Sequence, residues 1–394
     1  MTRLPWIALA FAVGAACHGD RSTSLGATPA GDASVPPAPA VPGEPSNRPD
    51  ASVLADAGPA DAGRPIDAST GPSQLTVHPR RGAPVDDPTA PAGPVLVLDS
   101  GAPASTVFGW MQGALFSAPH GDLVVLNASS GDPAASMLAA AAFRSVQTLS
   151  LGDGATRADF VAAAEIVDRA EAVWFEGGDQ ARYVRWKGTE LLAAVQRLHA
   201  HGGAIGGSSA GMIILGQAVN DALSTLSENL TTSRLLRDPF DPELHFTQEV
   251  LQLGPLVGTI TDPHFSTQDR MGRLATFMAR QVEGPAGFRG LAVDDGVALA
   301  IDAHGVGRRL GAEAGGSVYV VRGGQPARLS PGQPLRYDDL AVRRLDRASH
   351  RYDLRRNCGE ALAYRLDVDG ALESPYSVPP YASGAPLSDC PEEP

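Results

Sequence analysis

The sequence has little that would suit it to nucleic acid or to the interior of a membrane. No lysine and arginine run interleaves with aromatic residues, the formal net charge is −13, and the pI is near 5.1. Binding to nucleic acid needs a positive surface, so nothing in the sequence suggests that class of partner and the charge balance argues weakly against it. The apolar run within residues 1–17 is shorter than the roughly 20 residues of a membrane-spanning helix. The sequence contains no internal repeat, so nothing in it predicts a repeat protein.

The apolar run at the N-terminus instead has the layout of an export signal. Residues 1–17 combine a basic start at Arg3, an apolar stretch and small residues before Cys17, which is typical of a bacterial signal peptide. The cysteine resembles a lipoprotein processing site, although Gly14 stands where such sites usually carry leucine. We therefore expect an exported chain, either secreted or held at the membrane only through a lipid on Cys17.

Large apolar side chains are scarce in the segment that follows. Residues 18–92 are rich in Pro, Ala, Gly, Ser and Asp, so they cannot bury enough apolar surface to offset the entropy of an ordered chain. We predict a disordered tether there. The remaining residues suffice for one large α/β domain over 93–355 and a C-terminal extension over 356–394.

Cysteine is also rare, with three in 394 residues. If Cys17 is processed at export, Cys358 and Cys390 remain as a pair near the C-terminus. An even number of cysteines in an exported chain favours a disulfide, which would fasten the C-terminal extension. Two separate free thiols are the alternative.

The region from 93 to 355 alternates short apolar runs with segments of helical periodicity. Strands that alternate with helices pair in parallel through right-handed crossovers. This predicts an α/β fold with an open, mostly parallel sheet, helices on both faces in three layers, and a strand-rich C-terminal part. The expected strands are 93–99, 121–127, 146–152, 171–178, 202–207, 256–262, 289–302 and 316–324, and the expected helices are 133–144, 158–170 and 188–200.

Polar, glycine-rich segments follow three of these strands. They are GGDQ at 177–180, GGSSAG at 206–211 and DPHF at 262–265. In open α/β sheets, ligands bind at the carboxyl ends of the strands. We therefore expect the three segments to lie close together.

The segment 207–211, Gly-Ser-Ser-Ala-Gly, matches the pattern of a nucleophile elbow. Glycines at its ends remove side chains that would clash where a strand turns into a helix. Ser209 would then stand exposed above the sheet, with the next N–H groups able to bind an oxyanion. Ser208 would point elsewhere and hydrogen-bond locally. Without a base nearby, the same residues would form only a tight turn.

A serine nucleophile needs a base, and His264 is the candidate. It directly follows an apolar run, so it would stand at the carboxyl end of a strand, level with Ser209. Asp294 and Asp295, on a bend between two apolar runs, are the candidates to orient the imidazole. A structural histidine and an acid that caps a turn are the alternatives.

The segment after residue 176 supplies a fourth element. Gly177 and Gly178 permit a turn whose N–H groups face the elbow and could stabilise an oxyanion. Gln180 could bind a substrate amide, and Asp179 would cap the helix that starts at Ala181.

Together, GGDQ, GGSSAGM, DPHFSTQDRMGRL and GLAVDDGVAL resemble motifs of the cyanophycinase and peptidase E group of serine peptidases. That group has the class I glutamine-amidotransferase-like fold. The four motifs occur in the group's order between about 93 and 355, and LRYDDLAVRRLDRASHRYDL resembles its closing strand region.

The resemblance implies a function and a set of site residues. It implies hydrolysis of peptide links beside aspartyl residues, as in a cyanophycin-like polymer, through an acyl-enzyme and without a metal or organic cofactor. The implied residues are Ser209 as nucleophile, His264 as base, Asp295 as the third triad member, the N–H groups of Gly178 and Ala210 as oxyanion donors, and Gln180, Arg270 and Arg273 as substrate contacts.

Three positions depart from that group's pattern. Asp295 is one methylene shorter than the usual glutamate, so Asp294 could orient the base instead. Pro263 stands where cyanophycinases have glutamine, and Gln268 where they often have arginine. Loss of a cationic contact would weaken recognition of an acidic backbone.

Three functions fit these residues: a cyanophycinase-type peptidase, a dipeptidase for small Asp-containing peptides, and a non-catalytic binding protein on the same scaffold. The co-occurrence of Ser209, His264 and a carboxylate disfavours the third. A cysteine-dependent glutaminase is excluded because no cysteine lies near 207–211. The sequence leaves open whether the chain forms a homodimer.

Overall fold

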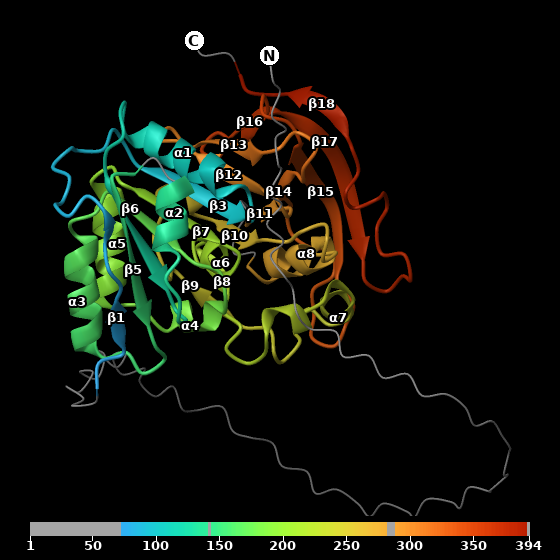
Figure 1. Cartoon of the computed structure of the whole chain (residues 1–394). Coiled ribbons are helices and arrows are strands. Elements are labelled where there is room, and N and C mark those ends of the chain that lie inside the picture. The colour runs from blue at the N-terminus through green and yellow to red at the C-terminus, as the bar shows by residue number, and fades with distance from the viewer. Residues whose placement is uncertain (1–71, 141–142, 282–287, 392–394) are drawn as a thin grey trace, which may run out of the picture. The chain divides into compact units, whose positions relative to one another are not determined.

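A computed structural model describes residues 72–140, 143–281 and 288–391 (Figure 1). The chain divides into two units, Met1–Arg64 and Pro65–Pro394, and every described residue belongs to the second. The predicted export signal and most of the predicted tether therefore lie outside the described residues. Within those residues, no helix has the length and apolar character needed to cross a membrane.

Five parallel strands form the first half of the sheet, in the order β5–β4–β6–β7–β3. They are almost uniformly buried, as expected for parallel strands whose two faces are both covered. Their bounds are β3 Val95–Ser100, β4 Asp122–Asn127, β5 Ser145–Leu151, β6 Ala172–Phe175 and β7 Ala204–Ser208.

Helices cover both faces of these five strands, as predicted (Figure 1). Alternate strand residues pack in opposite directions: Leu96 and Leu98 belong to the core under α3 and α5, while Val95 and Val97 face α1. The helix bounds are α1 Ala104–Leu115, α2 Ala134–Ala140, α3 Arg157–Val167 and α5 Glu190–Ala200.

The second half of the sheet is built around β10 (Thr259–Asp262). This strand is parallel to β8 (Ala218–Asn220) and to β11 (Arg289–Val293). Beyond β11 the strands become antiparallel, in the order β14, β15, β17. The other bounds in this half are β9 Phe246–Gln248, β14 Val318–Arg322, β15 Arg336–Leu345, β17 Cys358–Asp369, α7 Thr232–Arg237, α8 Met271–Arg280 and the 3-10 turn η2 Gly254–Leu256. A separate apolar core joins α7 and α8 to these strands.

One chain segment crosses between the two halves of the sheet. β11 lies in the second half, whereas β12 (Val297–Ile301) pairs antiparallel with β3 in the first. The predicted bend at Asp294 and Asp295 divides the expected strand region 289–302 into these two strands, which have different partners. β13 (Val306–Gly311) and β16 (Arg351–Asp353) continue from β12 to β17 and join the halves.

Both ends of the folded region extend beyond the predicted domain. β1 (Leu75–Val77) and β2 (Arg81–Gly82) pair with β5, so residues 72–92 are part of the fold and not of a tether. An edge strand is held by backbone hydrogen bonds, which composition does not reveal. In the C-terminal extension, β18 (Ala385–Ser388) pairs with β17, and a disulfide joins Cys358 to Cys390 with an S–S distance of 2.09 Å.

Candidate active site

Ser209 lies on a sharp turn between β7 and the short helix α6 (Ala210–Ile213). Its φ of 52° is in the left-handed region, which residues other than glycine adopt only at an energetic cost. The turn leaves no room for side chains beside it. A Cβ on Gly207 would lie 2.5 Å from the Gly211 backbone, and one on Gly211 would overlap the carbonyl oxygen of Phe175. The glycines of the predicted elbow are thus required by close backbone approach.

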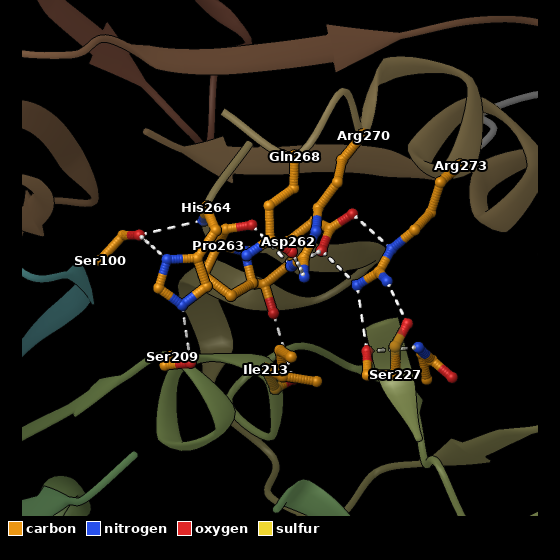
Figure 2. A network of polar contacts seen from close by, with 12 residues as sticks. Ser100, Ser209, Ile213, Ser227, Asp262, Pro263, His264, Gln268, Arg270 and Arg273 are labelled. Carbon is orange, nitrogen blue, oxygen red and sulfur yellow. Dashed lines mark hydrogen bonds and ion pairs between the residues drawn. The ribbon is translucent and has the colours of Figure 1, made fainter. Parts of the chain in front are cut away.

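His264 faces this serine from the other half of the sheet. It follows β10 after Pro263, and its Nε2 lies 2.9 Å from Ser209 Oγ (Figure 2). Its φ is also positive, at 52°. The two strand ends therefore meet as predicted, and they place a hydroxyl within hydrogen-bond distance of an imidazole nitrogen.

The structure places Asp295 against the imidazole and assigns Asp294 a different environment. His264 Nδ1 is hydrogen-bonded to Asp295 Oδ1, and Thr267 Oγ1 donates to Asp295 Oδ2 at 2.6 Å. Partial burial raises the pKa of Asp295, but the hydrogen bonds from Thr267 and His264 outweigh it and hold the pKa below its usual value. Asp294 is buried and accepts hydrogen bonds from backbone N–H groups, those of Ser266 at 2.9 Å and Ser317 at 2.8 Å.

Ser100, at the end of β3, is a site residue that the sequence motifs do not include. Its Oγ accepts a hydrogen bond from the His264 backbone N–H at 3.0 Å. The same oxygen lies 3.4 Å from His264 Nδ1 (Figure 2). It also lies 3.4 Å from Asp295 Oδ1. The sequence feature that could have identified Ser100 is its position at the carboxyl end of β3. This strand pairs directly with β7, which ends at Ser208.

The two implied oxyanion donors lie on one cavity with the serine. Gly178, Ser209, Ala210 and His264 line a cavity of about 470 Å³. The φ of Gly178 is 134°, a conformation that strongly favours glycine. As predicted, Asp179 caps α4 (Gln180–Val184), since its Oδ1 accepts a hydrogen bond from Ala181 N at 2.9 Å.

Gln180 and Arg270 line the same cavity. Gln180 is almost fully buried and donates to the Asn220 carbonyl at 3.3 Å. Arg270 Nη1 donates to Pro263 O at 2.8 Å and to Asp262 at 3.1 Å, and Nη2 donates to Gln268. Burial lowers the pKa of Arg270, while the neighbouring Asp262 raises it.

Arg273 lies beneath the cavity and does not line it. Its side chain is 2% exposed and donates to both carboxylate oxygens of Asp262, at 3.0 and 2.7 Å. It also donates to Ser227 O at 2.6 Å, which fixes the 3-10 turn η1 (Ser227–Asn229) (Figure 2). The structure thus brings Arg270, but not Arg273, to the place where the resemblance implied a substrate contact.

Asp262 is the only carboxylate shared by these two guanidinium groups among the ion pairs of the described residues. The buried cluster therefore carries one excess positive charge at the floor of the cavity. Elsewhere in the described part of the chain, no group of three or more His, Cys, Asp or Glu side chains is arranged to hold a metal ion.

Ser209, His264 and Asp295 have the mutual arrangement of a Ser-His-Asp triad, built on a sheet of parallel and antiparallel strands.

No protein-family model matches the chain, and no curated protein matches it. Among solved structures, the chain is similar to a peptidase from an acI-B1 Actinobacterium, with 14% identity and a TM-score of 0.41, over 67% of this chain and 98% of that one. It is also similar to a candidate peptidase E protein from Listeria monocytogenes EGD-e, with 13% identity and a TM-score of 0.36, over 53% of this chain and 95% of that one. At these values, the inference of function rests on the side-chain geometry.

Proposed function

We propose that this chain is a serine-type peptidase. The observation that supports it best is the alignment of Ser209 Oγ, 2.9 Å from His264 Nε2, with His264 Nδ1 hydrogen-bonded to Asp295. A hydroxyl becomes nucleophilic when a base accepts its proton, and the acid holds that base in the required tautomer. A binding protein would gain nothing from this alignment on two backbone conformations that cost energy.

In the proposed reaction, Ser209 Oγ attacks the carbonyl carbon of the scissile amide while its proton passes to His264 Nε2. The N–H groups of Gly178 and Ala210 stabilise the negative carbonyl oxygen. The imidazolium then protonates the leaving nitrogen as the C–N bond breaks, which leaves an ester on Ser209. His264 next accepts a proton from a water molecule as the water oxygen attacks the ester carbonyl. The imidazolium then returns this proton to Ser209 Oγ as the C–O bond breaks, which releases the carboxylic acid and regenerates the serine.

The charges around the cavity support a substrate that carries groups of both signs. Arg270 reaches the cavity with the excess positive charge of its cluster, and among the described residues its three hydrogen bonds leave two of five guanidinium N–H groups for a carboxylate. Asp179 and Glu228 line the same cavity and could hold a cation. An aspartyl backbone with arginine side branches, as in cyanophycin, supplies both charges. We propose peptide links beside aspartyl residues as the substrate.

We further propose that the protein is exported, with Cys17 as a lipid anchor or as part of a removed signal. The disulfide between Cys358 and Cys390 supports this location, because disulfides persist mainly outside the cytosol. Cell fractionation, with mass analysis of the mature N-terminus, tests the proposal: an unmodified chain that begins at Met1 in the cytosol would overturn it.

The activity is tested in two steps. First, the purified protein is incubated with a fluorophosphonate probe, which reacts with an activated serine; labelling should disappear in Ser209→Ala and persist in the matched neighbour Ser208→Ala. Second, the protein is incubated with cyanophycin, and release of aspartyl-arginine dipeptide is measured for the same variants.

The outcomes distinguish the three functions. Dipeptide release that requires Ser209 supports the polymer peptidase. Cleavage of Asp-containing dipeptides alone would assign a dipeptidase. Failure of the wild-type protein to label, together with ligand binding that Ser209→Ala leaves unaltered, would assign a binding protein and overturn the proposal.

A further inference from the structure

The loop that carries His264 has strained backbone at both ends. His264 opens it with a φ of 52°, and Asp269 closes it with a φ of 47°. Left-handed conformations are costly for residues other than glycine and persist where surrounding contacts hold them. At the first end, those contacts are the hydrogen bonds of Ser100 to His264 N and of Asp294 to Ser266 N.

At the second end, Thr232 Oγ1 on α7 donates to Asp269 O, and two further contacts come from Tyr381 in the C-terminal extension. Its hydroxyl donates to Asp269 Oδ1 at 3.1 Å and accepts from Met271 N at 3.2 Å. Both hydrogen-bonding roles of the phenol are therefore directed to the point where the loop turns into α8. The Tyr381 ring also packs edge-on against Phe265, the residue after His264, with ring centroids 5.6 Å apart.

Tyr381 is itself held by the frame that holds the catalytic turn. Arg344 Nη1 donates to Tyr381 O at 3.1 Å, and Arg344 Nε donates to Ser317 Oγ at 2.8 Å. Ser317 N in turn donates to the carboxylate of Asp294 at 2.8 Å. The extension thus contacts the histidine loop and the Asp294–Asp295 turn through one continuous set of hydrogen bonds.

We infer that Tyr381 is a positioning residue for His264, which makes the C-terminal extension a working part of the active site. This inference rests on the proposed serine chemistry. By fixing Phe265 and Asp269, Tyr381 keeps the imidazole at hydrogen-bond distance from Ser209. A small displacement of a catalytic group lowers the rate of the chemical step more than it lowers substrate affinity.

The test compares Tyr381→Phe, which keeps the ring and removes both hydrogen bonds, with Tyr337→Phe. The Tyr337 hydroxyl donates to Gly324 O at 2.8 Å, so this control also removes one hydrogen bond of a largely buried phenol. We expect Tyr381→Phe to slow fluorophosphonate labelling of Ser209 and to lower kcat, each by about 10-fold. KM should stay within about 2-fold, and Tyr337→Phe should react like the wild type.

Near-UV circular dichroism of each variant establishes that it is folded before rates are compared. If the folded Tyr381→Phe variant labels at the wild-type rate, or if KM rises while kcat is unchanged, the inference is wrong although the peptidase proposal stands. If the wild-type protein does not label at all, the peptidase proposal itself fails.

Discussion

Ser209 Oγ and His264 Nε2 lie 2.9 Å apart although 55 residues separate them in the chain. The two residues follow strands in different halves of the sheet, β7 and β10, and both have a φ of 52°. Two turns that cost energy are therefore oriented so that their side chains meet. Such outliers occur where surrounding structure imposes them and are concentrated at active sites.

The contacts of the two acidic neighbours predict different effects on substitution. Asp295→Ala should lower kcat by about 1,000-fold, because His264 loses the partner that sets its tautomer. Asp294→Ala should retain more activity and lose more stability, because two buried N–H groups lose their acceptor. Steady-state rates and thermal unfolding of both variants check this prediction. A larger loss of kcat in Asp294→Ala would reassign the orienting role.

The guanidinium at the cavity floor predicts a dependence on substrate charge. Arg270→Gln should raise KM for an aspartyl peptide by about 10-fold, since a hydrogen bond to a charged group contributes about 1.5–3 kcal/mol. KM for an uncharged ester substrate should change little. Arg280→Gln is the control, because Arg280 lies at the other end of α8 and donates to Pro239 O. Equal changes in KM for both substrates would contradict a role in recognising the carboxylate.

The close approach of the Phe175 carbonyl to Gly211 predicts that adding one methyl group at Gly211 lowers the stability of the fold. Gly211→Ala would force a Cβ into the carbonyl oxygen of Phe175, and we expect the unfolding free energy to fall by roughly 1–3 kcal/mol. Gly109→Ala is the matched control, because it lies in α1 with nothing within 4 Å of the added Cβ. That variant should gain about 0.5–1 kcal/mol. Denaturant unfolding measures both, and similar values for the two would contradict the packing described.

Glu171 predicts how stability depends on pH. Burial, together with the nearby carboxylates of Asp122 and Asp87, raises the pKa of this carboxyl from 4.5 to about 7, against the hydrogen bond from Asp122 N, which lowers it. The folded state therefore binds more protons than the unfolded state between those two pH values. Its contribution to stability is complete below about pH 4.5 and is lost as the pH rises through 7.

Thermal unfolding of Glu171→Gln checks this sign. The variant should match the wild type near pH 4.5 and exceed its Tm at pH 8, where the wild type carries the buried charge. Glu165→Gln, an exposed residue on α3, provides the comparison. If the Tm of the wild type increased relative to that of Glu171→Gln as the pH rises, the prediction would be contradicted.

Local pattern was enough for the parts of the fold that depend on local physics. The apolar runs at 93–99, 121–127 and 146–152 correspond to β3, β4 and β5, because a strand buried on both faces must be apolar throughout. Helix α1 was missed. Its sequence contains Gly109 and Gly113, which lower helix propensity, and the helix is stabilised by packing of Phe108 and Met111 on the sheet.

The sequence by itself determined the elbow glycines, the serine between them and a histidine at a strand end, since each follows from backbone sterics or the order of strands. Only the tertiary structure decided between Asp294 and Asp295, brought in Ser100 and Tyr381, and buried Arg273 against Asp262, outside the lining of the cavity. These arrangements depend on the turn at Asp294–Gly296, where the chain crosses between the two halves of the sheet. They also depend on the buried N–H groups that need an acceptor, such as those of Ser266 and Ser317. Such relationships join residues far apart in the chain, and no local spacing encodes them.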